Sequence, residues 1–265
     1  MDRKTMYMGL GAAIVIIFAI LVYMNTTGRS PGANVTAYIG KQVPESLISE
    51  LNVPASVSNK IVEGTVDQFP TSINAAPLRN GTKPEVLYIG AEYCPFCAVT
   101  RWGMIIALMR FGTFSNLRYM TSSSTDSYPN TPTFTFFNST YSSNYVAFVS
   151  VETLTNTYQP LQNMTSFQNA IFSKYNPGGG IPFIDFGNIS IQSGAPFMPQ
   201  VLAGYDWNSI AGSLGNINSS VAQSIVGSAD VFTAEICRMT NNTPSNVCSQ
   251  PYITYALRAM GVSGA

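Results

Sequence analysis

The chain has 265 residues, enough for one or two domains with a buried core, and 46% of them are hydrophobic. Only 10% are charged and the formal net charge is zero, so the chain lacks the excess of Lys and Arg typical of a nucleic-acid surface and we expect no nucleic-acid partner. Histidine is absent, which excludes Ser-His-Asp and Cys-His catalysis within the chain and removes the commonest zinc ligand.

The first feature along the chain is an uncharged apolar segment at residues 6–24, preceded by Arg3 and Lys4. Its length is close to the roughly 20 residues that a helix needs to cross a bilayer. A cleaved signal peptide would have a shorter apolar stretch and a small-residue cleavage site, so a retained anchor over residues 1–24 is the favoured interpretation. The positive-inside rule keeps the two basic residues in the cytoplasm. We therefore expect a single-pass cell-membrane protein with an extracellular C-terminal domain. Residues 25–76 are predicted to be a tether and lead-in segment.

Eight Asn-x-Ser/Thr sequons agree with this orientation, although a chain rich in Asn, Ser and Thr contains some by chance. One of them, at Asn25, directly follows the apolar segment. A glycan needs an exposed acceptor, and the turn predicted around Asn188 is a suitable place. The candidate acceptors are Asn34, Asn80, Asn138, Asn163, Asn188, Asn218 and Asn241.

The clearest structural signals begin with the apolar run "EVLYIGAEY", which predicts a buried strand. Two cysteines, Cys94 and Cys97, follow it, and apolar residues at helical spacing then continue to Gly112. Pro95, between the cysteines, fits the first turn of that helix. The segment "NLRYMTSSS" predicts a second strand, so we expect a parallel strand–helix–strand unit.

The remaining chain is predicted to hold an insertion and a helical end. Near residues 125–160, "TFTFF" and "NYVAFVSVE" predict an added β-hairpin. A helix is expected at 165–175, and "GGGIPFIDFGN" with "ISIQSG" predicts two strands joined at Gly187 and Asn188. Further helices are expected around 208–226, 229–240 and 252–260.

A Cys-x-x-Cys pair can be a redox dithiol, half of a metal site or a structural disulfide. At a helix start, first-turn N–H groups and the helix dipole stabilise a thiolate, so we expect Cys94 to be the exposed attacking thiol and Cys97 the resolving thiol. A zinc site would need Cys237 and Cys248, whose spacing is not that of a zinc knuckle, so we expect no metal and no cofactor. A disulfide between neighbours this close constrains little chain, which makes it a poor structural staple. For Cys237 and Cys248 we favour a structural disulfide; a shuttle pair that exchanges with the first is the alternative.

The motif "EVLYIGAEYCPFC" resembles the first strand and active-site start of the thioredoxin superfamily, and "GGGIPFIDFGN" resembles its cis-proline loop. The resemblance implies an α/β, thioredoxin-like fold over residues 77–265, with the inserted hairpin and a C-terminal helical extension. It also implies that Pro182 shapes the substrate site, with Ile181, Phe96 and Pro95 contacting the substrate. More closely, "IGAEYCPFCAVTRWGMIIALMRFG" and "AEICRMT…VC" resemble a family of unknown function from archaea, many of them thermoacidophiles.

The chain departs from thioredoxins at Tyr88, where they carry a buried acid. We expect Glu92 to be partly exposed, Arg101 to lie on a solvated helix face and Trp102 to be core, while the aromatics at 134–148 pack the insertion rather than form a substrate rim. The expected function is thiol–disulfide exchange on protein thiols and disulfides, with an unidentified membrane redox partner. The alternatives are a non-enzymatic glycosylated surface module with structural disulfides and, less favoured, a pilin-like filament subunit.

Overall fold

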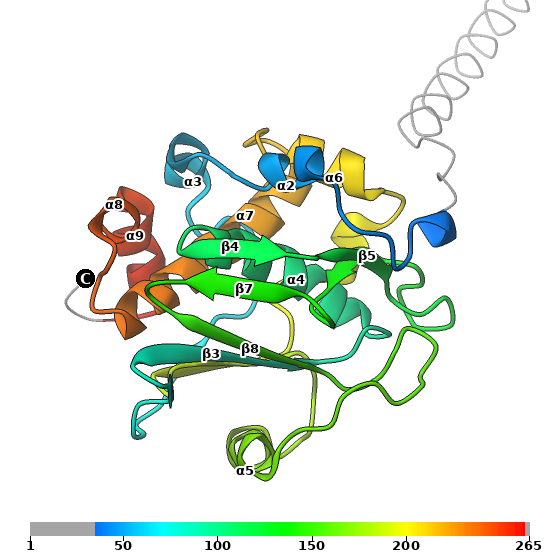
Figure 1. The fold of residues 1–265 in the computed structure, drawn as a ribbon. Coiled ribbons are helices and arrows are strands. Elements are labelled where there is room, and N and C mark those ends of the chain that lie inside the picture. Colours follow the sequence, from blue (N-terminus) through cyan, green and yellow to red (C-terminus); the bar gives the residue numbers. More distant parts are fainter. Residues whose placement is uncertain (1–34, 263–265) are drawn as a thin grey trace, which may run out of the picture. The chain divides into compact units, whose positions relative to one another are not determined.

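The computed structural model describes residues 35–262, so the anchor predicted over residues 6–24 lies outside the described part. Among residues 35–262, none of the helices has the length and apolarity that a bilayer crossing requires. This part of the chain is a mixed α/β unit whose main sheet combines parallel and antiparallel strands (Figure 1).

The helices are η1 (Val35–Ala37), α2 (Glu45–Glu50), α3 (Ala55–Ile61), α4 (Pro95–Met109), α5 (Ser166–Tyr175), η2 (Pro199–Leu202), α6 (Trp207–Ser213), α7 (Ser220–Met239), α8 (Ser245–Cys248) and α9 (Pro251–Ala259). The strands are β1 (Thr71–Ser72), β2 (Arg79–Asn80), β3 (Lys83–Gly90), β4 (Gly112–Ser115), β5 (Arg118–Thr121), β6 (Pro132–Thr135), β7 (Thr140–Ser143), β8 (Ala147–Glu152), β9 (Phe183–Phe186) and β10 (Ser190–Ser193).

Strand β3 is the centre of the main sheet because it pairs along both edges. It runs parallel to β8 and antiparallel to β9, and β9 continues through β10 to β1. Side chains of a strand alternate between its two faces. Val86 and Tyr88 therefore join the larger hydrophobic cluster with α4 and α7, while Leu87 and Ile89 join the smaller one under α5. This double burial explains the continuous apolar run in the sequence.

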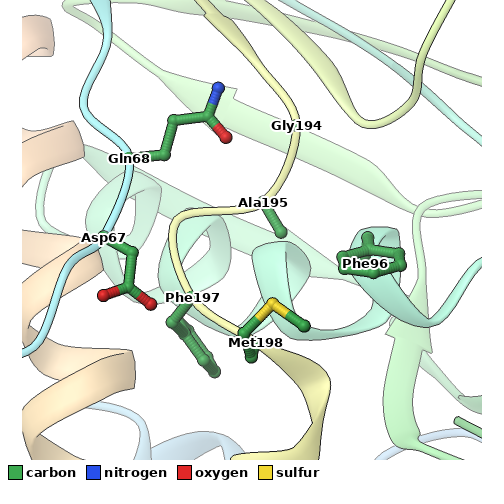
Figure 2. A pocket seen from close by; sticks show the side chains of 7 residues that line it. All are labelled: Asp67, Gln68, Phe96, Gly194, Ala195, Phe197 and Met198. Carbon is green, nitrogen blue, oxygen red and sulfur yellow. The ribbon is translucent and has the colours of Figure 1, made fainter.

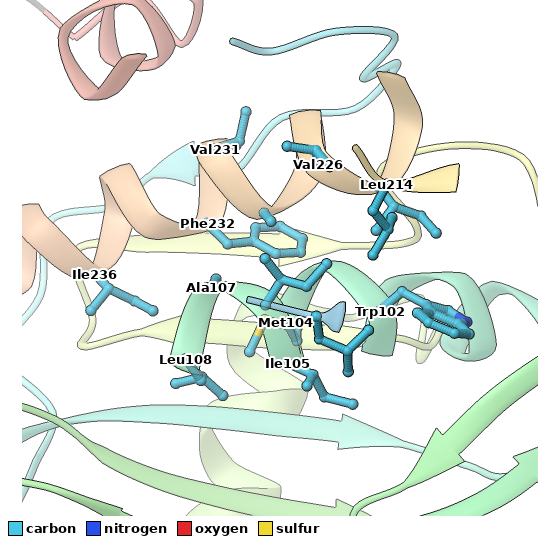
Figure 3. Close-up of a cluster of buried hydrophobic side chains, with 14 of the residues drawn as sticks. Trp102, Met104, Ile105, Ala107, Leu108, Leu214, Val226, Val231, Phe232 and Ile236 are labelled. Atoms are coloured by element: carbon cyan, nitrogen blue, oxygen red, sulfur yellow. The ribbon is translucent and has the colours of Figure 1, made fainter. Parts of the chain in front are cut away.

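Helix α4 packs between the sheet and helix α7. In Figure 3, Phe232 of α7 points toward α4 near Ala107, while Ile105 and Leu108 of α4 point away from α7. Trp102 is fully buried, as predicted, and its indole N–H donates to the Pro132 carbonyl at 2.9 Å. The helix that carries the cysteine pair is therefore a core element.

The predicted parallel strand–helix–strand unit exists, but its second strand is β8. Residues 118–121 form β5, which pairs antiparallel with β6 in a separate two-stranded sheet, and β7 pairs with β4. The hairpin predicted between "TFTFF" and "NYVAFVSVE" is therefore wrong, because neither segment pairs with the other. Four short strands instead occupy the connection from α4 to β8. Local alternation predicts that a segment is extended, but it carries no information about the partner strand.

The two helices predicted at 208–226 and 229–240 are divided differently. Helix α6 is short, and α7 runs unbroken through Gly227. A Cβ atom at Gly227 would lie 2.4 Å from the Glu63 carbonyl oxygen. This glycine permits a close approach of the lead-in segment to α7, and does not end a helix. The lead-in helices α2 and α3 pack on α6 and α7 respectively.

Two other sequence predictions are confirmed. Strands β9 and β10 form an antiparallel hairpin, with Gly187 and Asn188 at positive φ in its turn. The predicted helix at 165–175 is α5, which begins with a capping box: the Thr165 hydroxyl accepts the Gln168 backbone N–H, and the Gln168 side chain accepts the Thr165 backbone N–H.

Replacing Gly103 with Ala should lower the free energy of unfolding by about 1–3 kcal/mol, because the added Cβ would lie 2.9 Å from Ser228 Cβ across the α4–α7 contact. The matched control is Gly212→Ala on α6, where nothing lies within 4 Å of the new atom. Better helix propensity should raise stability there by about 0.5–1 kcal/mol. Urea denaturation measures both, and a shift in the same direction for both variants would contradict the packing role of Gly103.

Candidate functional site

The cysteine pair lies at the start of α4, just after the end of β3. Cys94 is the N-cap residue, with extended backbone, and its sulfur accepts the Cys97 backbone N–H at 3.3 Å. Cys97 lies in the first helical turn and is fully buried, while Cys94 is 5% exposed. Both are free thiols. The helix start is as predicted, but Cys94 is less exposed than an attacking thiol was expected to be.

The two thiols differ in acidity. The pKa of Cys94 is lowered, first by a hydrogen bond from the Cys97 thiol, then by the Cys97 and Phe96 backbone N–H groups and the charge of Arg101, while burial opposes the shift. The pKa of Cys97 is raised well above its usual value, chiefly by burial and then by the hydrogen bond between its thiol and Cys94. The arrangement therefore favours a thiolate at Cys94 beside a protonated Cys97.

The loop before β9 lies against the cysteines. The Ile181–Pro182 peptide bond is cis, and the Cys94 thiol lies 3.8 Å from the Ile181 carbonyl oxygen, to which it donates. The Pro182 carbonyl accepts the Gly194 N–H at 2.8 Å. Sequence reasoning therefore brought together residues that are 87 positions apart. Pro95 is buried at the helix start, and Phe96 is half-buried beside the pair.

A cavity of about 400 Å³ opens next to Phe96 (Figure 2). One wall comes from the lead-in segment, through Asp67 and Gln68, and the other from the loop after β10. Met198, on that loop, is 47% exposed. The residues lining the cavity are Asp67, Gln68, Phe96, Gly194, Ala195, Phe197 and Met198. Sequence reasoning missed this cavity because its walls come from segments far apart in the chain.

Aromatic rings flank the pair from two loops. Tyr93 and Tyr158 have ring centroids 4.6 Å apart, and Phe96 meets Tyr128 edge-on at 5.9 Å. The sequence analysis did not identify Tyr128 or Tyr158, because a lone Tyr in a polar loop gives no periodic signal. Among the aromatics at 134–148, Phe134 and Phe136 are buried against Trp102 and Tyr88. They pack into the main core rather than into the inserted hairpin that the sequence predicted.

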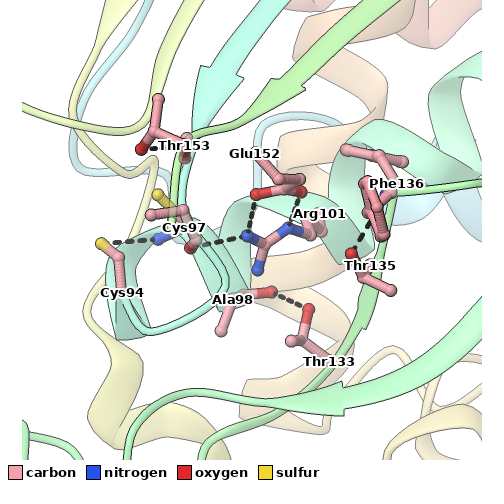
Figure 4. A network of polar contacts seen from close by, with 12 residues as sticks. Cys94, Cys97, Ala98, Arg101, Thr133, Thr135, Phe136, Glu152 and Thr153 are labelled. Carbon is pink, nitrogen blue, oxygen red and sulfur yellow. Dashed lines mark hydrogen bonds and ion pairs between the residues drawn. The ribbon is translucent and has the colours of Figure 1, made fainter. Parts of the chain in front are cut away.

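Buried charges lie behind the cysteines, as Figure 4 shows. Arg101 is fully buried, so its predicted position on a solvated helix face is wrong. Its Nε and Nη2 donate to the two Glu152 carboxylate oxygens at 2.8 and 2.7 Å, and Nη2 also donates to the Ala91 carbonyl at 2.7 Å. Glu92 is buried too, contrary to expectation, and burial raises its pKa. Helical spacing alone could not show that Arg101 pairs with Glu152 on β8.

Tyr88, which the sequence resemblance aligns with the buried acid of thioredoxins, is fully buried in the hydrophobic cluster that contains Trp102. Its ring centroid lies 5.8 Å from the Arg101 guanidinium carbon. Burial first, and the charge of Cys97 among other groups, raises its pKa well above the usual value. Tyr88 therefore stays protonated and cannot replace an acid as a base.

Cys237 and Cys248 form a disulfide, with Cα atoms 5.6 Å apart, as predicted. It joins the end of α7 to α8. Both sulfurs are bonded to each other, so they are not available to complete a zinc site with Cys94 and Cys97.

Asn188 is a poorer glycan acceptor than its turn position suggested. Its side-chain nitrogen donates to the Ala76 carbonyl at 2.7 Å, and the residue is half-buried. Asn34 lies outside the described residues. The remaining candidates are exposed: Asn80, Asn138, Asn163, Asn218 and Asn241.

The comparison with protein families gives one match, to a domain of unknown function, DUF929, over residues 70–238. The chain belongs to that family. The predicted membership of an uncharacterised family is therefore confirmed. The match covers Cys94, Cys97 and Pro182 and ends between the two disulfide cysteines. No curated protein and no solved structure matches the chain.

Replacing Cys97 with Ala should raise the pKa of Cys94, because the Cys97 thiol is the largest contributor to its low value. Below the usual thiol pKa, a higher pKa means less thiolate and slower alkylation by iodoacetamide. The rate of Cys94 alkylation against pH, measured on the full-length chain, tests this. Cys97→Ser keeps a hydroxyl donor and should preserve more of the low pKa. Identical profiles for all three proteins would contradict the assignment.

Proposed function

We propose that this protein is a thiol–disulfide oxidoreductase that uses Cys94 and Cys97 on protein substrates. One observation carries the proposal: a buried helix start makes Cys94 the more acidic thiol, keeps Cys97 protonated beside it, and places Cys94 against the Ile181–Pro182 loop. This difference in acidity matters because one thiol must attack the substrate as a thiolate, while the other must stay protonated until it resolves the mixed disulfide.

The order of elements supports a thioredoxin-like fold as part of the proposal. A central strand leads to the cysteine helix, a parallel strand lies beside it, and an antiparallel hairpin follows a cis-proline loop. These are the landmarks on which the sequence resemblance rests. The connection that holds four short strands, together with the helices after β10, would be this family's additions to that fold.

The proposed reaction is exchange through a mixed disulfide. The Cys94 thiolate attacks one sulfur of a substrate disulfide, a Cys94–substrate bond forms, and the other substrate sulfur leaves as a thiolate. Cys97 then attacks Cys94 and releases the second substrate sulfur. The reverse sequence oxidises a substrate dithiol.

A polypeptide substrate suits the surroundings of Cys94. The Ile181 N–H has no backbone partner among residues 35–262, so an extended chain can pair with it. The cavity beside Phe96 and Met198 offers an apolar place for a neighbouring side chain. The limited exposure of Cys94 requires such a chain to approach closely, and favours flexible or unfolded segments.

We place this activity outside the cytoplasm, behind the anchor predicted over residues 6–24. The Cys237–Cys248 disulfide supports an oxidising compartment, where such bonds persist. Oxidation or isomerisation is the favoured direction there. A membrane partner that resets the pair belongs to the same proposal.

The low exposure of Cys94 favours a second candidate, a non-enzymatic surface module in which the Cys-x-x-Cys pair is structural. The two candidates differ in how readily the pair exchanges. A structural pair resists reduction until the protein unfolds, whereas a redox pair exchanges in the folded state.

The reduction potential of the pair in the full-length protein decides between them, by equilibration in glutathione buffers and mass spectrometry, with Cys94→Ser as control. We expect a value between about −120 and −270 mV, the range of exchange-active proteins. We also expect Cys97→Ser to accumulate a mixed disulfide with a model peptide. A potential below about −300 mV, with no trapped complex, would leave the surface module as the better proposal.

A further inference from the structure

The Arg101–Glu152 pair lies directly behind Cys97. Arg101 follows Cys97 by one helical turn, so the two side chains project from the same face of α4. Glu152 ends β8 and is opposite Gly90 of β3, the strand that leads to the cysteines. Cys97, Arg101 and Glu152 are all fully buried. A charged pair therefore faces a thiol from which bulk water is excluded.

Stability does not account for this pair. Burying two charges costs several kcal/mol, and the attraction between them offsets that cost only when every remaining donor is satisfied. Arg101 Nη1 has no hydrogen-bond partner among the described residues. An apolar pair of similar volume would hold α4 against β8 at least as well.

Resolution needs a base for Cys97. Five titratable groups interact with the Cys97 thiol. They are Cys94 at the N-cap of α4, Arg101 on α4, Tyr88 on β3, Tyr93 after β3 and Glu152 on β8. Cys94 is bonded to the substrate at that stage. Arg101 cannot give up its proton, and the Tyr88 and Tyr93 hydroxyls stay protonated because burial raises the pKa of both. The chain contains no histidine, so Glu152 is the one remaining base among the groups facing Cys97 in the described part.

We propose that Glu152 accepts the proton of the Cys97 thiol during resolution, and that Arg101 is a positioning residue that holds the carboxylate for this transfer. This inference rests on the proposed exchange reaction. The Cys97 S–H bond breaks and its proton passes to a Glu152 oxygen, directly or through one water molecule. The Cys97 sulfur bonds to Cys94 and the Cys94–substrate bond breaks. The substrate sulfur leaves with the electron pair and takes a proton from solvent. When the protein acts as an oxidant, Glu152 returns the proton to Cys97 as its sulfur leaves.

A stopped-flow reaction with dithionitrobenzoate, an aromatic disulfide that releases a coloured thiolate, separates the two steps. Attack by Cys94 releases one thiolate, and resolution by Cys97 releases a second. In Glu152→Gln, we expect the second phase to slow at neutral pH by about 10²-fold, the lower end of general-base effects, and the first phase to change little. The rate of the second phase should also rise more steeply with pH, because hydroxide must replace the carboxylate as the base. Glu152→Asp, which keeps the base, should restore most of the rate and the flatter profile.

The matched control is Asp230→Asn, which breaks the buried ion pair between Arg110, at the C-cap of α4, and Asp230 on α7. Arg110 lies 13 residues beyond Cys97, about 20 Å along the helix, so this variant should leave the ratio of the two phases unchanged. If Glu152→Gln fails to fold, the apolar replacement Arg101→Met with Glu152→Leu provides a variant without the pair. It should show the same slow second phase.

The outcomes distinguish the two proposals. A second phase of unchanged rate and pH profile in a folded variant without Glu152 would overturn the role of this carboxylate and leave the exchange reaction standing. A wild-type protein that shows no first phase while folded would overturn the exchange reaction itself.

Discussion

Helix α4 is enclosed by the sheet on one side, by α7 on another and by β6 at its flank, and thirteen of its fifteen residues are buried. A helix held this way cannot shift without opening the core, because protein interiors are close-packed. The position of its first turn is therefore fixed, and with it the separation between Cys94 and the Ile181 carbonyl. The site depends on packing far from the cysteines, at Trp102 and Phe232.

Charge is scarce in this chain, and two buried ion pairs lie at opposite ends of α4. Arg101 meets Glu152 near the first turns of α4, and Arg110 meets Asp230 near its end. The two pairs occupy different environments, since one adjoins the reactive thiols and the other joins α4 to α7. Without histidine, the site has no side chain whose unperturbed pKa lies near neutrality. Changes of protonation must then come from thiols and carboxylates whose surroundings shift them.

The sequence predicted what local pattern determines. The buried strand, the helix start at Cys94, the β9–β10 hairpin and the Cys237–Cys248 bridge follow from periodicity, turn residues and spacing. It failed where a contact joins distant segments. Arg101 looked like a surface residue because its partner is on β8, and β5 looked like the parallel strand because alternation does not identify a neighbour. The cavity beside Phe96 and the loop rings had no local signal.

The connection between α4 and β8 holds four short strands, and it places Tyr128 against Phe96 at the edge of the site. The free-energy cost of closing a flexible loop rises only with the logarithm of its length. The loop around Tyr128 can therefore be lengthened, shortened or changed in sequence at small cost to the stability of the fold, while the cysteines stay fixed at the start of a rigid helix. Members of the family can diversify the surface that meets a partner without altering the chemistry beneath it.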